Sequence, residues 1–269
     1  MAAVLLKRNL INLYENLNPA EKTEFRNLLL SHYIKETSLL VQKSIANLIS
    51  ILLPVVEIKN WLELQQLLDQ AVKSSPDSAA TFVLLNSILY HFKAPKELFT
   101  YLLNALKTPH LAEEAIKCVT SVVESQDIDA SFAVEFIKIW EQSSWPEEVS
   151  LVAMEVLTTM VDRKIKVADD VTIWVCDKII SNRKLSNRFR TAGCDYLFSL
   201  AESGSKLLAS RDNLLKKIVE TVCLTCSEPY HHKEDDDESG GEFVQEIALW
   251  LIETLAITIK PKKIYPVLF

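Results

Sequence analysis

Glycine is scarce in this sequence. Only four of the 269 residues are glycine, namely Gly193, Gly204, Gly240 and Gly241, whereas an average usage of about 7% would give roughly nineteen. Tight β-turns, β-bulges and phosphate-binding loops all depend on glycine. The chain therefore has almost no material for a β-rich or nucleotide-binding fold, and we expect it to be all-α.

Apolar residues recur at helical spacing along almost the whole chain, for example from Val41 to Leu52, from Val149 to Met160 and from Phe189 to Leu200. Prolines stand where many of these stripes begin, and the first turn of a helix tolerates proline because its N–H groups have no partner there. Pro54 and Pro229 are expected to end helices instead. The predicted helices cover residues 2–15, 19–34, 37–53, 60–73, 76–91, 95–107, 109–124, 128–143, 146–162, 168–181, 185–202, 205–226, 242–258 and 261–269.

The short connections between these helices make neighbours antiparallel. Helix pairs starting near residues 37, 76, 109, 146 and 185 repeat every 33 to 39 residues or so, which is typical of two-helix repeats. The signature residues of TPR and ankyrin repeats are missing, which leaves HEAT-type repeats. The sequence predicts one right-handed superhelical solenoid over residues 1–269, made of about seven antiparallel HEAT-type helix pairs.

The chain begins with an apolar helical stretch, Ala2–Leu10, directly after Met1. A stable domain rarely starts in the middle of its own core, and helical arrays close with polar caps. We therefore expect the sequence to be an internal part of a longer repeat protein.

The net charge indicates which partners to expect, and the cysteine content indicates the redox compartment. The net charge of −7 disfavours nucleic acid as a direct ligand and favours basic proteins. The five cysteines are an odd number and lie mostly on apolar faces, as expected for free thiols in a reducing compartment. No apolar run approaches the ~18 residues needed to cross a membrane, so no membrane partner is expected.

One long polar connection, residues 227–242, is expected to be a flexible acidic loop within the solenoid. A solvated linker without a specific role is the alternative. The partner-binding carboxylates predicted in this loop are Glu234, Asp235, Asp236, Asp237 and Glu238.

Other candidate sites have simpler interpretations. Cys223 and Cys226 stand near His231 and His232 in a zinc-like spacing, but both cysteines lie on a helix face that fits the core better than a metal site. Most of the five tryptophans are expected in the core. The basic pair Lys7-Arg8 and the basic segment Arg183–Arg190 are interpreted as solvated helix edges. No catalytic or nucleotide-binding motif occurs, so we expect neither an enzyme nor a resident cofactor or metal.

Three segments follow one another in a fixed order along the chain. The first is Ala2–Leu10 with the helix that follows it, Pro19–Glu36. The second is Glu57–Leu68, in which Leu62 follows Trp61. The third is the acidic loop followed by Glu246–Ala256 and Lys260–Pro266. In order and spacing these segments resemble the importin beta (karyopherin beta) family, whose helix at the second segment begins Trp-Pro, so that Leu62 stands in place of the proline.

The resemblance implies a nuclear transport receptor that shuttles between cytoplasm and nucleus. Such a receptor binds basic cargo proteins, including histones and ribosomal proteins, contacts Phe-Gly nucleoporins, and releases cargo when it binds the small GTPase Ran in its GTP form. The sequence would cover about the second to the eighth repeat, with cargo held by an acidic concave surface formed mostly by the second helix of each pair. A HEAT-repeat scaffold subunit of a signalling or coat complex is the alternative function.

Overall fold

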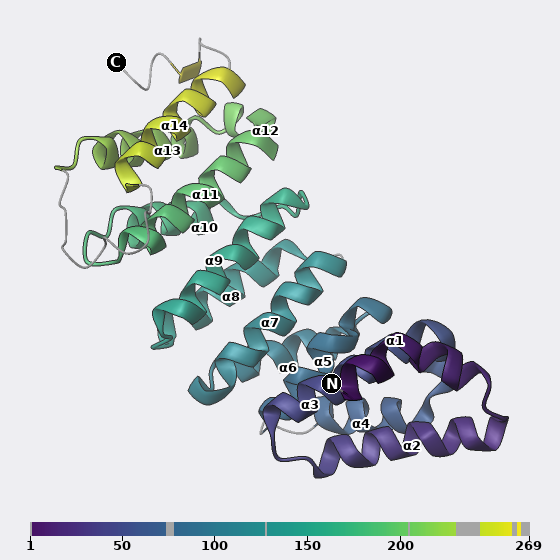
Figure 1. Cartoon of the computed structure of the whole chain (residues 1–269). Helices are drawn as coiled ribbons and strands as arrows, with labels where there is room; N and C mark the ends of the chain where they lie inside the picture. Colours follow the sequence, from purple (N-terminus) through teal and green to yellow (C-terminus); the bar gives the residue numbers. More distant parts are fainter. Residues whose placement is uncertain are drawn as a thin grey trace. The chain divides into compact units, whose positions relative to one another are not determined.

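The structure is a computed structural model and describes residues 2–73, 78–126, 128–203, 205–229, 243–259 and 263–264. Within these residues every regular element is a helix, which confirms the all-α prediction (Figure 1). The α-helices are α1 (Ala2–Glu15), α2 (Pro19–Lys35), α3 (Leu39–Val56), α4 (Leu62–Lys73), α5 (Ala79–Ile88), α6 (Lys96–Leu106), α7 (Pro109–Ser125), α8 (Ala130–Gln142), α9 (Glu147–Asp162), α10 (Asp169–Trp174), α11 (Asn187–Ser203), α12 (Ser205–Ala209), α13 (Asp212–Cys226) and α14 (Val244–Thr258). Two 3-10 helices, η1 (Ile58–Asn60) and η2 (Leu89–His91), and one π-helix, η3 (Val175–Ile180), complete them.

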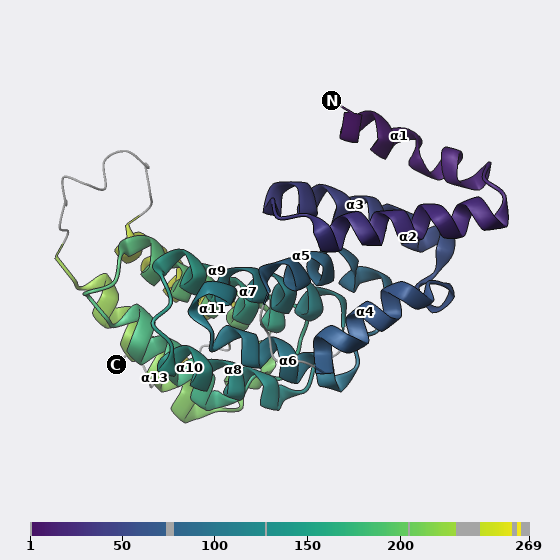
Figure 2. The ribbon, with the colours of Figure 1, turned by 90° about the horizontal axis from the view of Figure 1, so that it is seen from below.

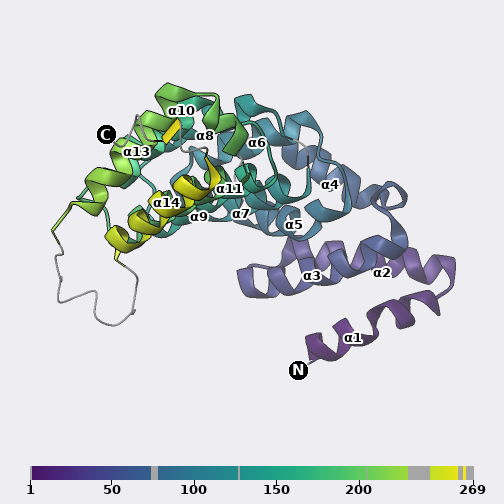
Figure 3. The same ribbon diagram turned by 90° about the horizontal axis from the view of Figure 1, so that it is seen from above.

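The chain divides into two compact units, residues 1–126 and 127–269, which we describe separately. Each unit consists of two layers of helices. In the second unit α9, α11 and α14 pack side by side in one layer, and α8, α10 with η3, and α13 form the other (Figures 2 and 3). In the first unit α1, α3, α5 and α7 form one layer, while α2, α4 and α6 form the other.

One layer of each unit is more closely packed than the other. In the first unit, α3, α5 and α7 contact one another far more extensively than α2, α4 and α6 do. In the second unit, the contacts among α9, α11 and α14 are likewise more extensive than those among α8, α10 and α13. In a curved stack, the closely spaced helices lie on the inner side of the curve. We therefore call α3, α5 and α7, and α9, α11 and α14, the inner layers, and the others the outer layers.

The helix pairs begin one helix away from the predicted positions. Helix α2 packs on α3, α6 on α7 and α13 on α14, so a pair starts with an outer helix and ends with an inner one. The pairs predicted to start near residues 37, 76, 109, 146 and 185 are therefore wrong in phase. Connections of similar length on both sides of each helix leave the phase undetermined in the sequence.

The helix starts follow local chemistry. The Asn18 side chain accepts hydrogen bonds from the backbone N–H groups of Ala20 and Glu21, both at 3.0 Å, and the Glu21 carboxylate accepts from the Asn18 N–H at 2.8 Å. This is the capping box that Asn18 and Glu21 predict. Thr108 occupies the N-cap of α7, but its side chain makes no capping bond.

Three predicted helices differ in detail. Helix α3 continues through Pro54 to Val56, because the buried side chains of Leu53 and Val56 extend its packing and a proline so close to the end removes only one ladder bond. The helix predicted over 205–226 breaks between α12 and α13, and the one predicted over 168–181 ends as the π-helix η3. Neither change has a glycine or proline to signal it.

The expectation that no apolar segment reaches membrane-spanning length is wrong for α3. Its 18 residues are long and apolar enough by length and composition alone. However, its fully buried residues Ala46, Ile49 and Leu52 belong to the core, and the helix packs against α1 and α5. These contacts are those of a core helix in the inner layer.

Candidate functional site

Acidic residues recur every seven positions along the exposed sides of two inner helices of the second unit. The exposed carboxylates are Glu148, Glu155 and Asp162 on α9, and Asp195 and Glu202 on α11. A step of seven residues returns to nearly the same face of an α-helix. The carboxylates of each helix therefore form a row along its axis.

Helix α14 continues this pattern with exposed Glu246 and Glu253. Trp250, 46% exposed, lies four residues after the first carboxylate and three before the second, and such positions share a helix face. Helix α11 packs directly against α9 and α14, so the three rows are neighbours. We call the seven carboxylates of these rows the acidic face: Glu148, Glu155, Asp162, Asp195, Glu202, Glu246 and Glu253.

Basic residues are rare on the described helices that carry the acidic face. Arg188 is the one exposed basic residue on α9, α11 and α14. In the outer layer of the same unit, by contrast, Lys217 pairs with Asp177 at 2.5 Å and Arg211 pairs with Asp169. Carboxylates of the acidic face that form no ion pair with any described residue are Glu148, Glu155, Asp162, Glu202, Glu246 and Glu253.

The inner layer of the first unit carries charges that neutralise one another. Lys43 of α3 contacts Glu114 of α7 at 3.0 Å, and Lys117 contacts Glu113 at 2.9 Å and Glu114 at 3.1 Å. The hydrogen bond from Lys117 lowers the pKa of Glu113. Burial lowers the pKa of Lys117, but its hydrogen bonds to the two glutamates outweigh burial and raise it. An acidic surface open to basic partners is therefore a property of the second unit.

A groove of about 480 Å³ opens in the second unit where α8 and η3 end and α9 and α11 begin. Four aromatic side chains line it, and we call it the aromatic groove. The buried Trp140 ring is central, with its centroid 5.8 Å from that of Trp145, 5.0 Å from that of Trp174 and 6.1 Å from that of Phe189. Trp145 and Trp174 are only half-buried, so this cluster is partly open to a ligand.

Two carboxylates flank the aromatic groove. The Oε1 atom of Glu141 accepts a hydrogen bond from the Trp174 indole Nε1–H at 2.6 Å. The Oε1 atom of Glu147 accepts one from the Ser186 hydroxyl. Both partners are neutral, and neither carboxylate forms an ion pair with a described residue. Lys178 also lines the groove.

Close packing of α11 against the π-helix fixes one wall of the aromatic groove. A Cβ atom on Gly193 would lie 2.8 Å from Ile180 Cγ1 and 3.0 Å from Ile179 Cγ2, both closer than ordinary contact. The missing side chain lets α11 approach η3 and holds Ile179 in the groove wall. This is one of the two glycines that the sequence places outside the acidic loop, and its role follows from packing.

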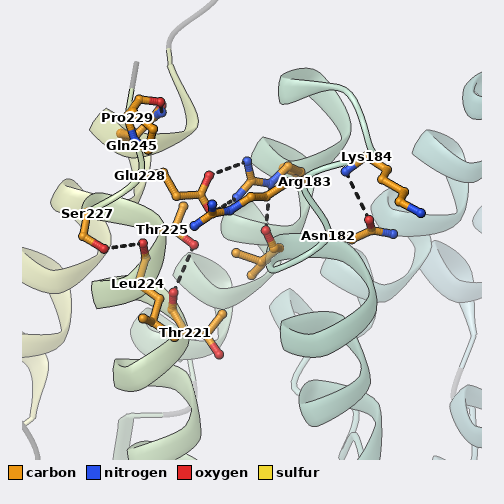
Figure 4. A network of polar contacts seen from close by, with 12 residues as sticks. Asn182, Arg183, Lys184, Thr221, Leu224, Thr225, Ser227, Glu228, Pro229 and Gln245 are labelled. Carbon is orange, nitrogen blue, oxygen red and sulfur yellow. Dashed lines mark hydrogen bonds and ion pairs between the residues drawn. The ribbon is translucent and has the colours of Figure 1, made fainter. Parts of the chain in front are cut away.

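A buried ion pair lies behind the same wall. Arg190 is 4% exposed and donates two hydrogen bonds to the Glu228 carboxylate, at 2.8 and 2.9 Å, and a third from Nε to the Ile180 carbonyl at 2.7 Å. Arg183 adds a contact to Glu228 at 3.1 Å (Figure 4). The interpretation of Arg183–Arg190 as a solvated edge is therefore wrong for Arg190, because its guanidinium finds a buried carboxylate that is distant in sequence.

The predicted acidic-loop residues Glu234, Asp235, Asp236, Asp237 and Glu238 lie outside the described residues. Of the segment 227–242 the structure describes only Ser227–Pro229, where the Pro229 carbonyl accepts a bond from the Gln245 side chain at 3.4 Å (Figure 4). Their role as partner-binding residues stays a prediction.

The cysteine and tryptophan predictions have mixed outcomes. Cys118, Cys176 and Cys194 are buried, while Cys223 and Cys226 are half-buried. Burial raises the pKa of both half-buried thiols, as expected for cysteines packed at the edge of a core. His231 and His232 lie outside the described residues. The buried tryptophans are Trp61 and Trp140, whereas Trp145 and Trp174 are half-buried and Trp250 is exposed.

A second groove, of about 340 Å³, lies between the outer helices α2 and α4 of the first unit. Its apolar residues are Leu30, Ile34 and Leu67, and Ile34 is largely exposed. Its polar rim consists of Asn27, Ser31, Lys35 and Glu63. We call it the outer groove.

The sequence predicts an acidic concave surface but not the residues of the acidic face, and it does not predict the aromatic groove. The seven-residue spacing of Glu148, Glu155 and Asp162 was a signal available in the sequence. The aromatic groove had no such signal, because Trp140 and Trp145 come from one helix pair while Trp174 and Phe189 come from the next. Only the stacking of the repeats brings them together.

No family model matches the sequence, and no curated protein matches it. Solved structures of Kap121p share its fold. A Kap121p mutant matches with a TM-score of 0.75 at 15% identity, Kap121p bound to Pho4p with 0.71 at 16%, and Kap121p bound to RanGTP with 0.68 at 15%. Each match covers 99% of this chain and 28% of the other chain. The protein therefore has the fold of a Kap121p segment, a helical solenoid, and spans about 28% of the length of the structures it matches.

Proposed function

We propose that the protein is part of a nuclear transport receptor of the karyopherin beta family, of the importin-4 type, and that it binds basic cargo proteins for nuclear import. The acidic face is the observation that carries this proposal. Its carboxylates form rows on three adjacent helices, and six of the seven, all but Asp195, form no ion pair with any described residue. The fold shared with Kap121p, whose solved structures include complexes with Pho4p and RanGTP, supports the receptor class. The colinear resemblance of Ala2–Leu10, Glu57–Leu68 and Lys260–Pro266 supports the family.

Cargo recognition is electrostatic and depends on shape. Inner helices spaced about 10 Å apart, with carboxylates at every second turn, present a grid of negative charge to an extended basic segment. Each exposed ion pair contributes only ~0–1 kcal/mol and is screened by salt. Affinity therefore comes from several pairs together, and basic tails of histones or ribosomal proteins are the cargo class expected. The residues Glu234–Glu238 would add to the same negative field.

The outer groove is the proposed site for Phe-Gly nucleoporins. It is apolar at its base, lies between two outer helices, and is large enough for an aromatic side chain. This leaves the acidic face available for cargo. Ran in its GTP form is expected to compete with cargo, and the receptor is expected to shuttle between cytoplasm and nucleus without catalytic activity of its own.

A binding assay tests the proposal. The protein should bind a lysine- and arginine-rich peptide in low salt, and the affinity should fall steeply as salt rises. A variant with Glu155→Gln, Glu202→Gln and Glu253→Gln should bind about tenfold more weakly, since it loses three pairs of ~0.5 kcal/mol each. The matched control changes three outer-layer carboxylates, Asp170→Asn, Glu135→Gln and Glu220→Gln, and should bind normally. Equal binding by both variants would refute the role of the acidic face.

A scaffold subunit of a signalling or coat complex is the alternative. Such a protein would hold two folded subunits and would bind neither basic peptides nor Phe-Gly peptides. The acidic face favours the receptor, because a surface that carries mostly negative charge suits basic cargo, whereas a scaffold interface does not require charges of one sign.

A further inference from the structure

We propose that the aromatic groove binds an arginine side chain of the basic cargo. This inference rests on the proposed function and names a specific contact for it. The groove is a separate feature from the acidic face: it lies at the connections between α8 and α9 and between η3 and α11, and its lining is aromatic.

The tryptophan rings of the groove favour a planar cation as the ligand. Trp145 and Trp174 are half-buried beside the buried Trp140, so the cluster is held rigidly and still reaches solvent. The face of a tryptophan ring attracts cations. A guanidinium group is planar and weakly hydrated, so it stacks on such a ring more readily than an ammonium group does.

The charged side chains of the groove also favour a cation. Glu141 and Glu147 each use Oε1 to accept a hydrogen bond from a neutral donor, Trp174 and Ser186 respectively. No basic side chain among the described residues forms an ion pair with either carboxylate, so each Oε2 can accept a hydrogen bond from an N–H group of the ligand. Lys178 is the one basic residue of the lining, and two carboxylates against one lysine leave the groove negative. A ligand with an aromatic-stacking cation fits this combination better than a neutral apolar side chain.

The position of the groove connects it to the acidic face. Glu147 lines the groove, and the next residue, Glu148, begins the row of carboxylates on α9. Adjacent helical positions point about 100° apart, so the two carboxylates face different directions from the same turn. A basic segment that lies along α9 therefore reaches the groove at the start of the helix.

The experiment compares an arginine peptide with a peptide of the same sequence in which each arginine is replaced by an uncharged residue. One contains arginine separated by glycine and serine, and the other contains citrulline, a neutral isostere, in place of each arginine. The double variant Glu141→Gln and Glu147→Gln should weaken binding of the arginine peptide about tenfold and leave the citrulline peptide unchanged. Lys178→Gln should strengthen binding of the arginine peptide about twofold, because it removes a repelling charge.

The indole N–H resonances report the site directly. On addition of the arginine peptide, the resonances of Trp145 and Trp174 should shift while that of fully buried Trp61 should not. The variant Trp174→Phe assigns one resonance. Thermal unfolding of each variant shows whether it is folded.

The outcomes separate the two proposals. If the wild-type protein does not bind the arginine peptide at low salt, the proposed function fails and this inference fails with it. If it binds, and the acidic-face variant weakens binding while Glu141→Gln with Glu147→Gln does not, the inference alone is overturned. It is also overturned if a neutral phenylalanine peptide shifts the Trp145 and Trp174 resonances and the arginine peptide does not.

Discussion

Replacement of Glu228 by glutamine is predicted to destabilise the second unit strongly. The carboxylate is buried, with 9% of its side chain exposed, and it accepts hydrogen bonds from Arg190 at 2.8 and 2.9 Å and from Arg183 at 3.1 Å. Glutamine keeps the shape but removes the charge, so the buried Arg190 guanidinium loses its counter-ion. Removal of one partner from a buried pair costs about 3 to 5 kcal/mol. Since the amide oxygen still accepts one bond, we expect a loss of about 3 kcal/mol.

The assay is urea unfolding followed by circular dichroism, with four further variants: Arg183→Gln, Arg190→Met, Glu228→Met and the combination of the last two. Arg183 is 66% exposed, and Arg183→Gln should cost no more than about 1 kcal/mol. Arg190→Met combined with Glu228→Met removes both charges and should cost clearly less than the sum of the two single changes, because neither charge is then left unpaired. A loss below about 1 kcal/mol for Glu228→Gln, or strict additivity in the double variant, would refute this account of the pair.

Substitutions at three positions and one labelling experiment test local features. Gly193→Ala should destabilise the protein by about 1 to 2 kcal/mol in thermal unfolding, because overpacking outweighs the gain in helix propensity; increased stability would contradict the packing argument. Lys164 follows the end of α9 with a positive φ of 59°. Its N–H donates to the Val161 carbonyl at 2.8 Å, and the Ile165 N–H donates to the Met160 carbonyl at 2.9 Å. Because glycine adopts this conformation without strain, Lys164→Gly should stabilise the protein by about 1 kcal/mol in the same assay. Asn18→Ala should cost about 1 kcal/mol in urea unfolding through loss of the cap, and Asn18→Asp should cost much less. A thiol reagent at pH 8 should label the half-buried Cys223 and Cys226 before the others, as mass spectrometry can follow. Burial raises the thiol pKa of Cys176 to about 11 and that of Cys194 to about 12, and it raises that of Cys118 well above its usual value, so these three should react only after unfolding.

Most of the fold could be predicted from the sequence. Helical apolar spacing and prolines at helix starts predicted nearly every helix in the described residues, because those signals are local. The predicted helix boundaries and helix types are wrong where tertiary packing, and not local sequence, determines them. Pro54 stays inside α3 because burial of Leu53 and Val56 outweighs one lost hydrogen bond. Trp174 is followed by a π-helix that no glycine or proline signals.

The site was harder to predict than the fold. The sequence predicts an acidic concave surface on the second helix of each pair, but the predicted pairs are one helix out of phase with those of the structure, so the prediction does not point to α9, α11 and α14. A local run of acids such as Glu234–Glu238 stands out in a sequence by itself. A row such as Asp195 and Glu202 is spread over two turns, and it becomes a surface only when α9, α11 and α14 lie side by side.

Carboxylate footprinting tests the central claim most directly. The protein is labelled at exposed carboxylates with a carbodiimide and an amine, with and without a saturating basic peptide, and the labelled residues are identified by mass spectrometry. The account predicts that the peptide protects Glu155, Glu202 and Glu253 while Asp170 and Glu220 of the outer layer stay labelled. Protection confined to the outer layer, or equal labelling with and without peptide under conditions where the peptide is bound, would contradict it.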